Sequence, residues 1–156
     1  MKMINDQPME RSAGFGYELL RNELIPELLG KEQASILYWA GKNLARKHPV
    51  ESIEELSRFF HDAGWGNLAI EREKKNKIMF AVRSPLLSKQ AKNEAAFTLE
   101  AGFLAQQYER MKNRVADAHA SCKSGVLHIL VEWDLKDTVN DTVHEETRSR
   151  RRSRTR

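Results

Sequence analysis

The spacing of apolar residues switches from helical to alternating, back to helical and again to alternating, and this order limits what the chain can fold into. Three helices are predicted first, over 15–24, 32–47 and 53–63, where apolar residues recur every three or four positions. Pro26 should kink or restart the first helix, because proline lacks the backbone N–H that the preceding turn needs. A capping-box pattern at Ser52 starts the third helix. The second helix is apolar almost all round, so we expect it to be buried centrally.

A strand pair, a fourth helix and a second strand pair follow. Alternating residues predict strands around 68–72 and 78–82, and helical spacing returns over 97–112. Two further strands are predicted over 114–122 and 126–133. Two hairpins separated by one helix favour an antiparallel sheet of about four strands with the helices packed on one side, which is an α+β fold.

The chain of 156 residues has room for one domain of ordinary size. We expect a flexible segment over 1–14, a single domain over 15–137, and a polar, then arginine-rich, disordered tail over 138–156. Cys122 is the only cysteine, which excludes an internal disulfide. No signal peptide is visible, and the longest uncharged apolar stretch, 34–41, is far shorter than the roughly 20 residues that span a bilayer. We therefore expect a soluble cytoplasmic protein.

The positive charge of the chain is confined to its end. The formal net charge is +4, but without the last nine residues 20 basic residues face 22 acidic ones. Such a run usually stays solvated, because its charges repel one another and it has nothing apolar to bury. Its arginines could bind phosphates of nucleic acid or of an anionic surface, and no other basic face extends them. They are Arg148, Arg150, Arg151, Arg152, Arg154 and Arg156.

The sequence lacks the common phosphate-loop, dinucleotide, zinc-protease and nucleophile-elbow motifs. His119, Cys122 and His128 come nearest to a metal cluster, but structural zinc takes four ligands. His119 and Cys122 are also an odd number of positions apart, so a regular strand would project them to opposite faces. Cys122 is either a reactive thiol or an inert, partly buried one. We expect no metal, no cofactor and no enzymatic activity.

Two glycines interrupt apolar helices, at Gly41 and Gly102. An interior glycine costs a helix about 1 kcal/mol relative to alanine. Close helix–helix approach, a dimer seam or room for a ligand beside the backbone would offset that cost. Aromatic residues cluster near these glycines, and they either line a pocket or form the core. The candidate ligand-binding residues are Leu37, Tyr38, Gly41, Leu44, Phe59, Trp65, Phe97, Gly102 and Phe103.

Five short segments carry a resemblance to a known family. They are Leu28-Leu29-Gly30, Tyr38-Trp39-Ala40-Gly41-Lys42-Asn43-Leu44-Ala45-Arg46-Lys47, Ala63-Gly64-Trp65-Gly66, Leu99-Glu100-Ala101-Gly102-Phe103 and Val131-Glu132-Trp133-Asp134. Together they resemble the YslB family of uncharacterised proteins from Gram-positive bacteria, over about 17–137. That family is similar in turn to the 4-vinyl reductase-type ligand-binding domain and to subunits of the transport protein particle (TRAPP).

The resemblance implies a TRAPP-like α+β fold that is often dimeric through its helices, with a hydrophobic pocket between helices and sheet. It implies no established activity. The chain departs from the relatives in three ways. Cys122 lies late in the chain, unlike the acyl-carrying cysteine of TRAPP subunits, and the paired cysteines of the 4-vinyl reductase type are missing. The Tyr-x-Ser-x-Arg motif of the related haem sensors is also absent, so haem is not expected.

Three hypotheses of function follow. The leading one is a non-enzymatic cytoplasmic protein that binds a small apolar ligand in a hydrophobic pocket, or acts through homodimerisation and protein contacts, or both. The alternative is a binder of nucleic acid or anionic surfaces that works through the arginine-rich tail. An enzyme built on the aromatic pocket has the least support, because it needs a polar trio converging there and the sequence does not indicate one.

Overall fold

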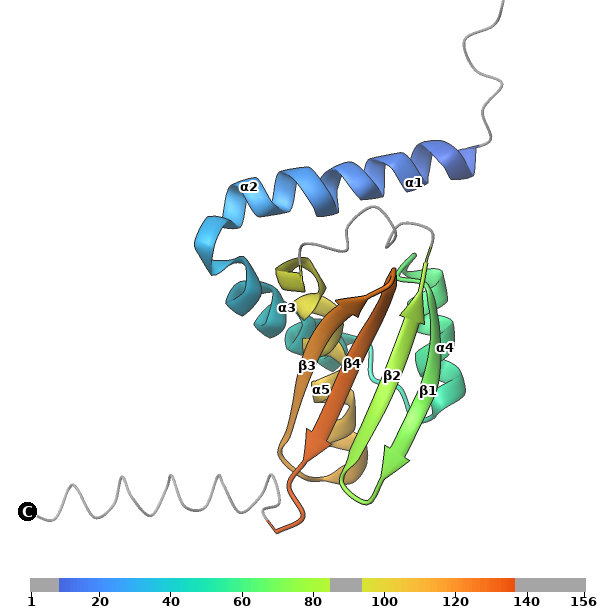
Figure 1. Cartoon of the computed structure of the whole chain (residues 1–156), viewed down its shortest axis with the longest axis vertical. Helices are drawn as coiled ribbons and strands as arrows, with labels where there is room; N and C mark the ends of the chain where they lie inside the picture. Colours follow the sequence, from blue (N-terminus) through green and yellow to red (C-terminus); the bar gives the residue numbers. More distant parts are fainter. Residues whose placement is uncertain (1–8, 85–93, 137–156) are drawn as a thin grey trace, which may run out of the picture.

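The computed structural model describes residues 9–84 and 94–136. In chain order the elements are α1 (Met9–Leu19), the π-helical turn η1 (Leu20–Leu24), α2 (Ile25–Leu29), the 3₁₀ turn η2 (Gly30–Glu32), α3 (Gln33–Lys47), α4 (Ile53–Asp62), β1 (Asn67–Lys74), β2 (Lys77–Arg83), the 3₁₀ turn η4 (Glu94–Phe97), α5 (Thr98–Lys112), β3 (Ala116–Lys123) and β4 (Val126–Trp133). Figure 1 shows the sheet in front of α3, α4 and α5, with α1 and α2 crossing above its upper end. The predicted α+β architecture is confirmed.

The sheet has four antiparallel strands in the order β1-β2-β4-β3. The second strand of each hairpin therefore lies at the centre, and β1 and β3 form the two edges. One detail of the predicted alternation is wrong. The register shifts between Ile70 and Arg72, so Ile70 is opposite Phe80 whereas Arg72 is opposite Met79. A β-bulge at Glu71 thus moves Arg72 to the other face of the sheet.

The N-terminal helix is longer than the sequence indicated. It begins at Met9 rather than near Phe15, so residues 9–14 of the predicted flexible segment belong to α1. The helix passes Pro26 through the wider turn η1, in which the backbone N–H of Ile25 donates to the carbonyl of Leu20. This wider turn lets the helix continue past Pro26, although proline has no backbone N–H to donate to the preceding turn.

Helix α5 is the central helix, in place of the predicted α3. Residues 100 to 105 of α5 are all buried, because α5 lies between α3 and the sheet. Helix α3 buries only one side, and its Ile36 and Trp39 are exposed. The apolar residues of α3 predict a buried helix, but two of them belong to the protein surface. The inward residues of the two central strands complete the core: Ile78, Phe80, Val82, Leu127, Ile129 and Val131.

Candidate functional site

Three of the predicted ligand-binding residues meet in an aromatic cluster around Phe103. The ring of Phe59 stacks on that of Phe103 with centroids 4.5 Å apart, and the Trp65 ring meets Phe103 edge-on at 5.2 Å. Phe60, which the sequence did not single out, also packs edge-on against Trp65 at 5.0 Å. These contacts are typical aromatic pairs. The cluster is packed by its own side chains, and its role in holding a ligand stays a prediction.

Each of the two helix glycines lies against the backbone of the other helix where α3 crosses α5. A Cβ atom on Gly41 would overlap the carbonyl oxygen of Leu99, and one on Gly102 would overlap the carbonyl oxygen of Tyr38. The two backbones are therefore in direct contact, which only residues without a side chain permit. Of the three explanations considered for these glycines, close helix–helix approach is the one that the geometry realises. The other helix occupies the space that a ligand would need at this point.

The remaining predicted residues lie around that crossing. Leu37 is buried, and Tyr38 and Leu44 are half-buried against the core. Phe97 lies at the start of α5, where the guanidinium carbon of Arg21 is 5.9 Å from its ring centroid. The nine residues thus do not line a single space. They divide into the aromatic cluster, the helix crossing and the neighbourhood of Arg21.

A buried ion pair joins the N-terminal helix to α5. The guanidinium of Arg21 donates to Glu100 Oε2 at 2.5 Å, to the carbonyl of Ala96 at 2.8 Å and to the Tyr17 hydroxyl at 2.6 Å. Arg21 is 7% exposed and Glu100 is 2% exposed. Burial raises the pKa of Glu100, while the nearby Arg21 opposes that rise. Sequence reasoning missed this pair, because its partners lie on helices far apart in the chain.

A surface groove of about 430 Å³ separates α3 from the β3 edge, and we call it the α3–β3 groove. The Tyr38 hydroxyl donates to Asp117 Oδ1 at 2.7 Å, and His119 Nε2 lies 3.3 Å from Asp117 Oδ2. Burial and the hydrogen bond to Asp117 raise the pKa of Tyr38. The groove is lined by Ala34, Ser35, Tyr38, Trp39, Thr98, Ala101, Asp117, Ala118, His119 and Ala120. The structure therefore brings together a polar trio that the sequence did not reveal.

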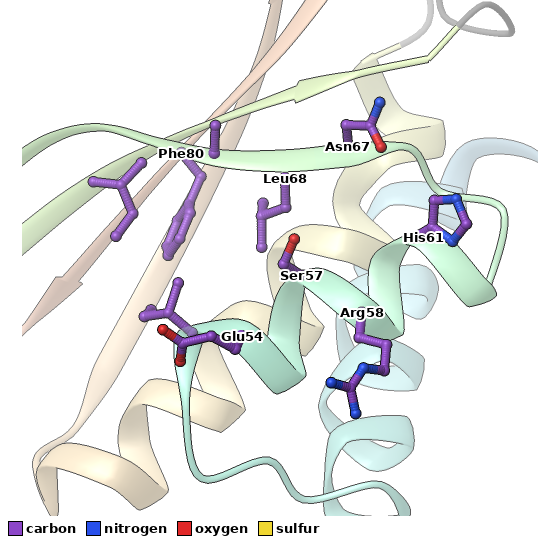
Figure 2. A pocket seen from close by; sticks show the side chains of 10 residues that line it. Glu54, Ser57, Arg58, His61, Asn67, Leu68 and Phe80 are labelled. Atoms are coloured by element: carbon purple, nitrogen blue, oxygen red, sulfur yellow. The ribbon is translucent and has the colours of Figure 1, made fainter.

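A second groove, of about 580 Å³, opens between α4 and β1, and we call it the α4–β1 groove. Figure 2 shows Leu68 pointing from the strand toward the helix and Ser57 pointing back toward the strand. The lining combines an apolar floor with a polar rim. It consists of Ile53, Glu54, Ser57, Arg58, His61, Asn67, Leu68, Ala69, Ile70 and Phe80.

Large apolar side chains are exposed along the N-terminal helix and on α3. Leu28 is 72% exposed, Phe15 is 61% exposed and Trp39 is 58% exposed. We call this surface the N-terminal apolar face. It comprises Phe15, Leu19, Leu20, Leu24, Leu28, Ile36 and Trp39.

The histidines and the cysteine of the late hairpin are dispersed. Cys122 packs against the core side of β3, while His119 is on the opposite, exposed side, as the spacing predicted. His128 Nδ1 pairs with Glu71 Oε2 at 3.0 Å. Burial, together with the nearby Glu94, raises the pKa of the Cys122 thiol, which lowers its thiolate fraction at neutral pH. Within 9–84 and 94–136, no group of three or more potential ligands could hold a metal ion.

The remaining predictions concern segments or properties beyond this geometry. The arginines of the tail, from Arg148 to Arg156, lie outside the described residues, so their part in binding nucleic acid or anionic surfaces stays a prediction. None of the helices in the described part of the chain is long and apolar enough to cross a membrane. The cytoplasmic location and the homodimer also stay predictions.

Comparison with known proteins first identifies the class of fold. The structure resembles that of a vinyl-4-reductase family protein from Methanocaldococcus jannaschii, with a TM-score of 0.51 and 18% sequence identity. The match covers 85% of this chain and 99% of that protein. At this identity the likeness establishes the fold alone.

The family follows from the sequence. Residues 14–132 match the family described as a protein of unknown function (DUF2507), and the chain belongs to that family. It is also 41% identical, over 129 residues, to the uncharacterized protein YslB of Bacillus subtilis. That match covers 80% of this chain and 87% of the relative. The resemblance to the YslB family drawn from the five motifs is therefore confirmed.

Proposed function

We propose that this protein works without catalysing a reaction, by pairing with a second copy of itself through the N-terminal apolar face. The observation that carries the proposal is the exposure of seven large apolar side chains on consecutive helices. Isolated apolar residues are common on protein surfaces, whereas a patch of this extent usually marks an interface.

The size of the face supports pairing of two copies. Four of its seven large apolar residues, Phe15, Leu20, Leu28 and Trp39, are more than half exposed, and each partner of a standard interface buries ~800 Å². Aromatic anchors such as Phe15 and Trp39 are the residue type that dominates binding energy at the centre of interfaces. The same face on both copies makes a twofold-symmetric contact self-complementary.

The buried ion pair gives the face its orientation. Arg21 and Tyr17 point from the N-terminal helix toward Ala96 and Glu100, so the opposite side of that helix faces outward. The short hydrogen bonds of the ion pair allow only one geometry, and they therefore fix which side of the N-terminal helix faces α5. The helix is therefore presented in a set orientation with its apolar residues free for a partner.

The polar trio in the α3–β3 groove supports a role other than catalysis. The raised pKa of Tyr38 keeps its phenol protonated at neutral pH, so it is a hydrogen-bond donor and not a base. The side chains of Asp117 and His119 are 64% and 72% exposed. Acid–base groups gain their effect where water is excluded, and these are open to solvent.

Native mass spectrometry and light scattering of the purified chain test the proposal. We expect a dimer for the wild type, and a monomer for Leu28→Glu and Trp39→Glu, because each puts a charge into the contact. Val115→Glu is the matched control, since Val115 is an exposed apolar residue outside the face. Circular dichroism checks that the variants are folded. A wild-type chain that is monomeric at about 100 μM would refute the proposal.

A second candidate function is binding of a small apolar ligand in the α3–β3 groove. It is supported by the combination of an exposed indole at Trp39 with the small side chains of Ala34, Ala101, Ala118 and Ala120, which leave the groove open. A planar, mostly apolar molecule with one O–H or N–H group stacks on the indole and donates a hydrogen bond to the Asp117 carboxylate.

Mass measurement of gently purified protein tests this second function. We expect extra mass on the wild type and none on Ala120→Leu, which fills the groove from β3. Leu28→Glu should keep the extra mass, because Leu28 does not line the groove. Bare mass on the wild type, or extra mass that persists on Ala120→Leu, would overturn the assignment of a ligand to this groove.

A further inference from the structure

The two edges of the sheet differ in how their backbone is protected. Along β3, side chains accept hydrogen bonds from edge amides. Glu109 accepts from Ala116 N at 3.3 Å, and Glu94 accepts from Cys122 N at 3.2 Å. Ala118 N donates to Asp117 Oδ1 at 2.9 Å and to the Tyr38 hydroxyl at 3.3 Å. An edge strand treated in this way is closed to pairing with another strand.

The β1 edge is protected over only half its length. The half next to the hairpin turn contains the bulge and four consecutive charged residues, 71–74, and both features discourage pairing. The other half, 67–70, carries no charge, and Ile70 is 41% exposed.

The α4–β1 groove lies directly beside the unprotected half. Ile70 and Leu68 point to the same side as their cross-strand partners Phe80 and Val82, which is the side facing the helices. Figure 2 shows Phe80 and Leu68 entering the space above α4. Side chains of a strand repeat on one face every second residue. A fifth strand beside β1 would therefore place alternate side chains in this groove.

The charges on the rim distinguish the two ends of the groove. Glu54 lines the end beside Phe80, and His61 lines the end near Asn67, where its Nδ1 lies 3.4 Å from Asp62 Oδ1; the Arg58 guanidinium points away from the strand (Figure 2). Since 67–70 is uncharged, the carboxylate of Glu54 distinguishes one end of the groove from the other. The complementary occupant has a basic residue at the end beside Glu54.

We propose that 67–70 together with the α4–β1 groove, here called the β1 edge site, binds an extended segment of a partner protein as a fifth strand. The segment has apolar residues at alternate positions and a basic residue near Glu54. Main-chain hydrogen bonds to β1 supply affinity, and the groove supplies specificity. The site shares no residue with the N-terminal apolar face, so it does not depend on the proposed function.

Fluorescence anisotropy with two labelled heptapeptides tests the proposal. Both alternate valine with threonine, one running from aspartate to lysine and the other from lysine to aspartate, because a strand can add in either direction. We expect one of them to bind the full chain, and a peptide with serine in place of valine to bind about tenfold more weakly or worse. Amide hydrogen exchange should show protection gained at 67–70 and not along β3.

Two variants and a matched control complete the test. Ile70→Lys and Ser57→Phe, which block the site from the strand and from the helix, should each weaken binding about tenfold or more. Val115→Lys alters an apolar residue of similar exposure elsewhere and should bind like the wild type. Failure of both peptides to bind at about 1 mM, or undiminished binding to both blocking variants, would overturn the proposal. Protection of 67–70 without peptide that grows with protein concentration would also overturn it, because a second copy would then be the occupant.

Discussion

The α3–α5 crossing and the N-terminal helix are both helical packings, but different interactions hold them in place. At the crossing, Gly41 and Gly102 allow the backbones of α3 and α5 to come into direct contact. The N-terminal helix is anchored by Arg21, and its outer side carries exposed leucines and Phe15. The first arrangement leaves nothing for a partner to bind, whereas the second presents a surface. We therefore expect the α3–α5 crossing to contribute more to the stability of the fold, and the N-terminal helix to be the place where a second copy binds.

The largest expected effect is at the crossing. Gly102→Leu drives a side chain into the backbone of Tyr38, so we expect a loss of more than about 4 kcal/mol in unfolding free energy, measured by denaturant titration. Gly16→Ala is the control on the N-terminal helix. Nothing lies within 4 Å of a Cβ there, and we expect a gain of about 0.5–1 kcal/mol. Equal effects of the two substitutions would remove the contrast between the regions.

The ion pair should give the next largest effect. Arg21→Met leaves the buried Glu100 without a partner, and we expect a loss of about 3 kcal/mol in unfolding free energy. Replacing both partners, by Arg21→Met with Glu100→Leu, should restore most of it, because an apolar pair needs no desolvation. A double variant no more stable than Arg21→Met alone would mean that the pair is not the anchor of this helix.

Alkaline pH should produce a smaller difference in stability between α5, which contains Tyr108, and the N-terminal helix, which contains Tyr17. Burial raises the pKa of Tyr108 to about 12, and it also raises the pKa of Tyr17. A raised folded-state pKa contributes stability that is complete below about pH 10 and is lost as the pH rises toward 12. Unfolding temperatures between pH 9 and 11 should therefore fall less steeply for Tyr108→Phe than for the wild type.

Tyr17→Phe is the comparison variant for the N-terminal helix. Its unfolding temperature should fall with pH less steeply than that of the wild type and more steeply than that of Tyr108→Phe. Both variants keep Tyr38, so that residue contributes equally to the two slopes. A steeper decline for Tyr108→Phe than for the wild type would contradict the sign of the shift.

The smallest effect on the fold is expected from the tail. Deletion of residues 148–156 should change the unfolding temperature by less than about 1 °C, because such a charged run has nothing apolar to bury in either region. The same deletion tests the alternative function. Binding of a labelled single-stranded oligonucleotide that weakens with salt and disappears on deletion would support it, whereas salt-independent binding would exclude it.

The order of elements, the two hairpins and the family could be predicted from residue patterns. Ser52 illustrates why: its side chain accepts from the backbone N–H of Glu55 at 3.2 Å, an interaction between near neighbours. The aromatic site was predicted only in part. Phe59, Trp65 and Phe103 do meet, but Tyr38 belongs to the α3–β3 groove with Asp117, its hydrogen-bond partner 79 positions along the chain.

Local periodicity determined which segments are helices and strands, and the interior glycines indicated that something must approach two helices closely. The tertiary structure alone decided what approaches them, since a glycine in sequence is compatible with a helix, a second copy or a ligand. It also decided that α5 and not α3 is central, that Arg21 pairs with Glu100, and that side chains cap the amides of one sheet edge while half of the other edge carries neither a bulge nor a charge. Each depends on which distant segments come together, and apolar spacing within one segment carries no information on its neighbours.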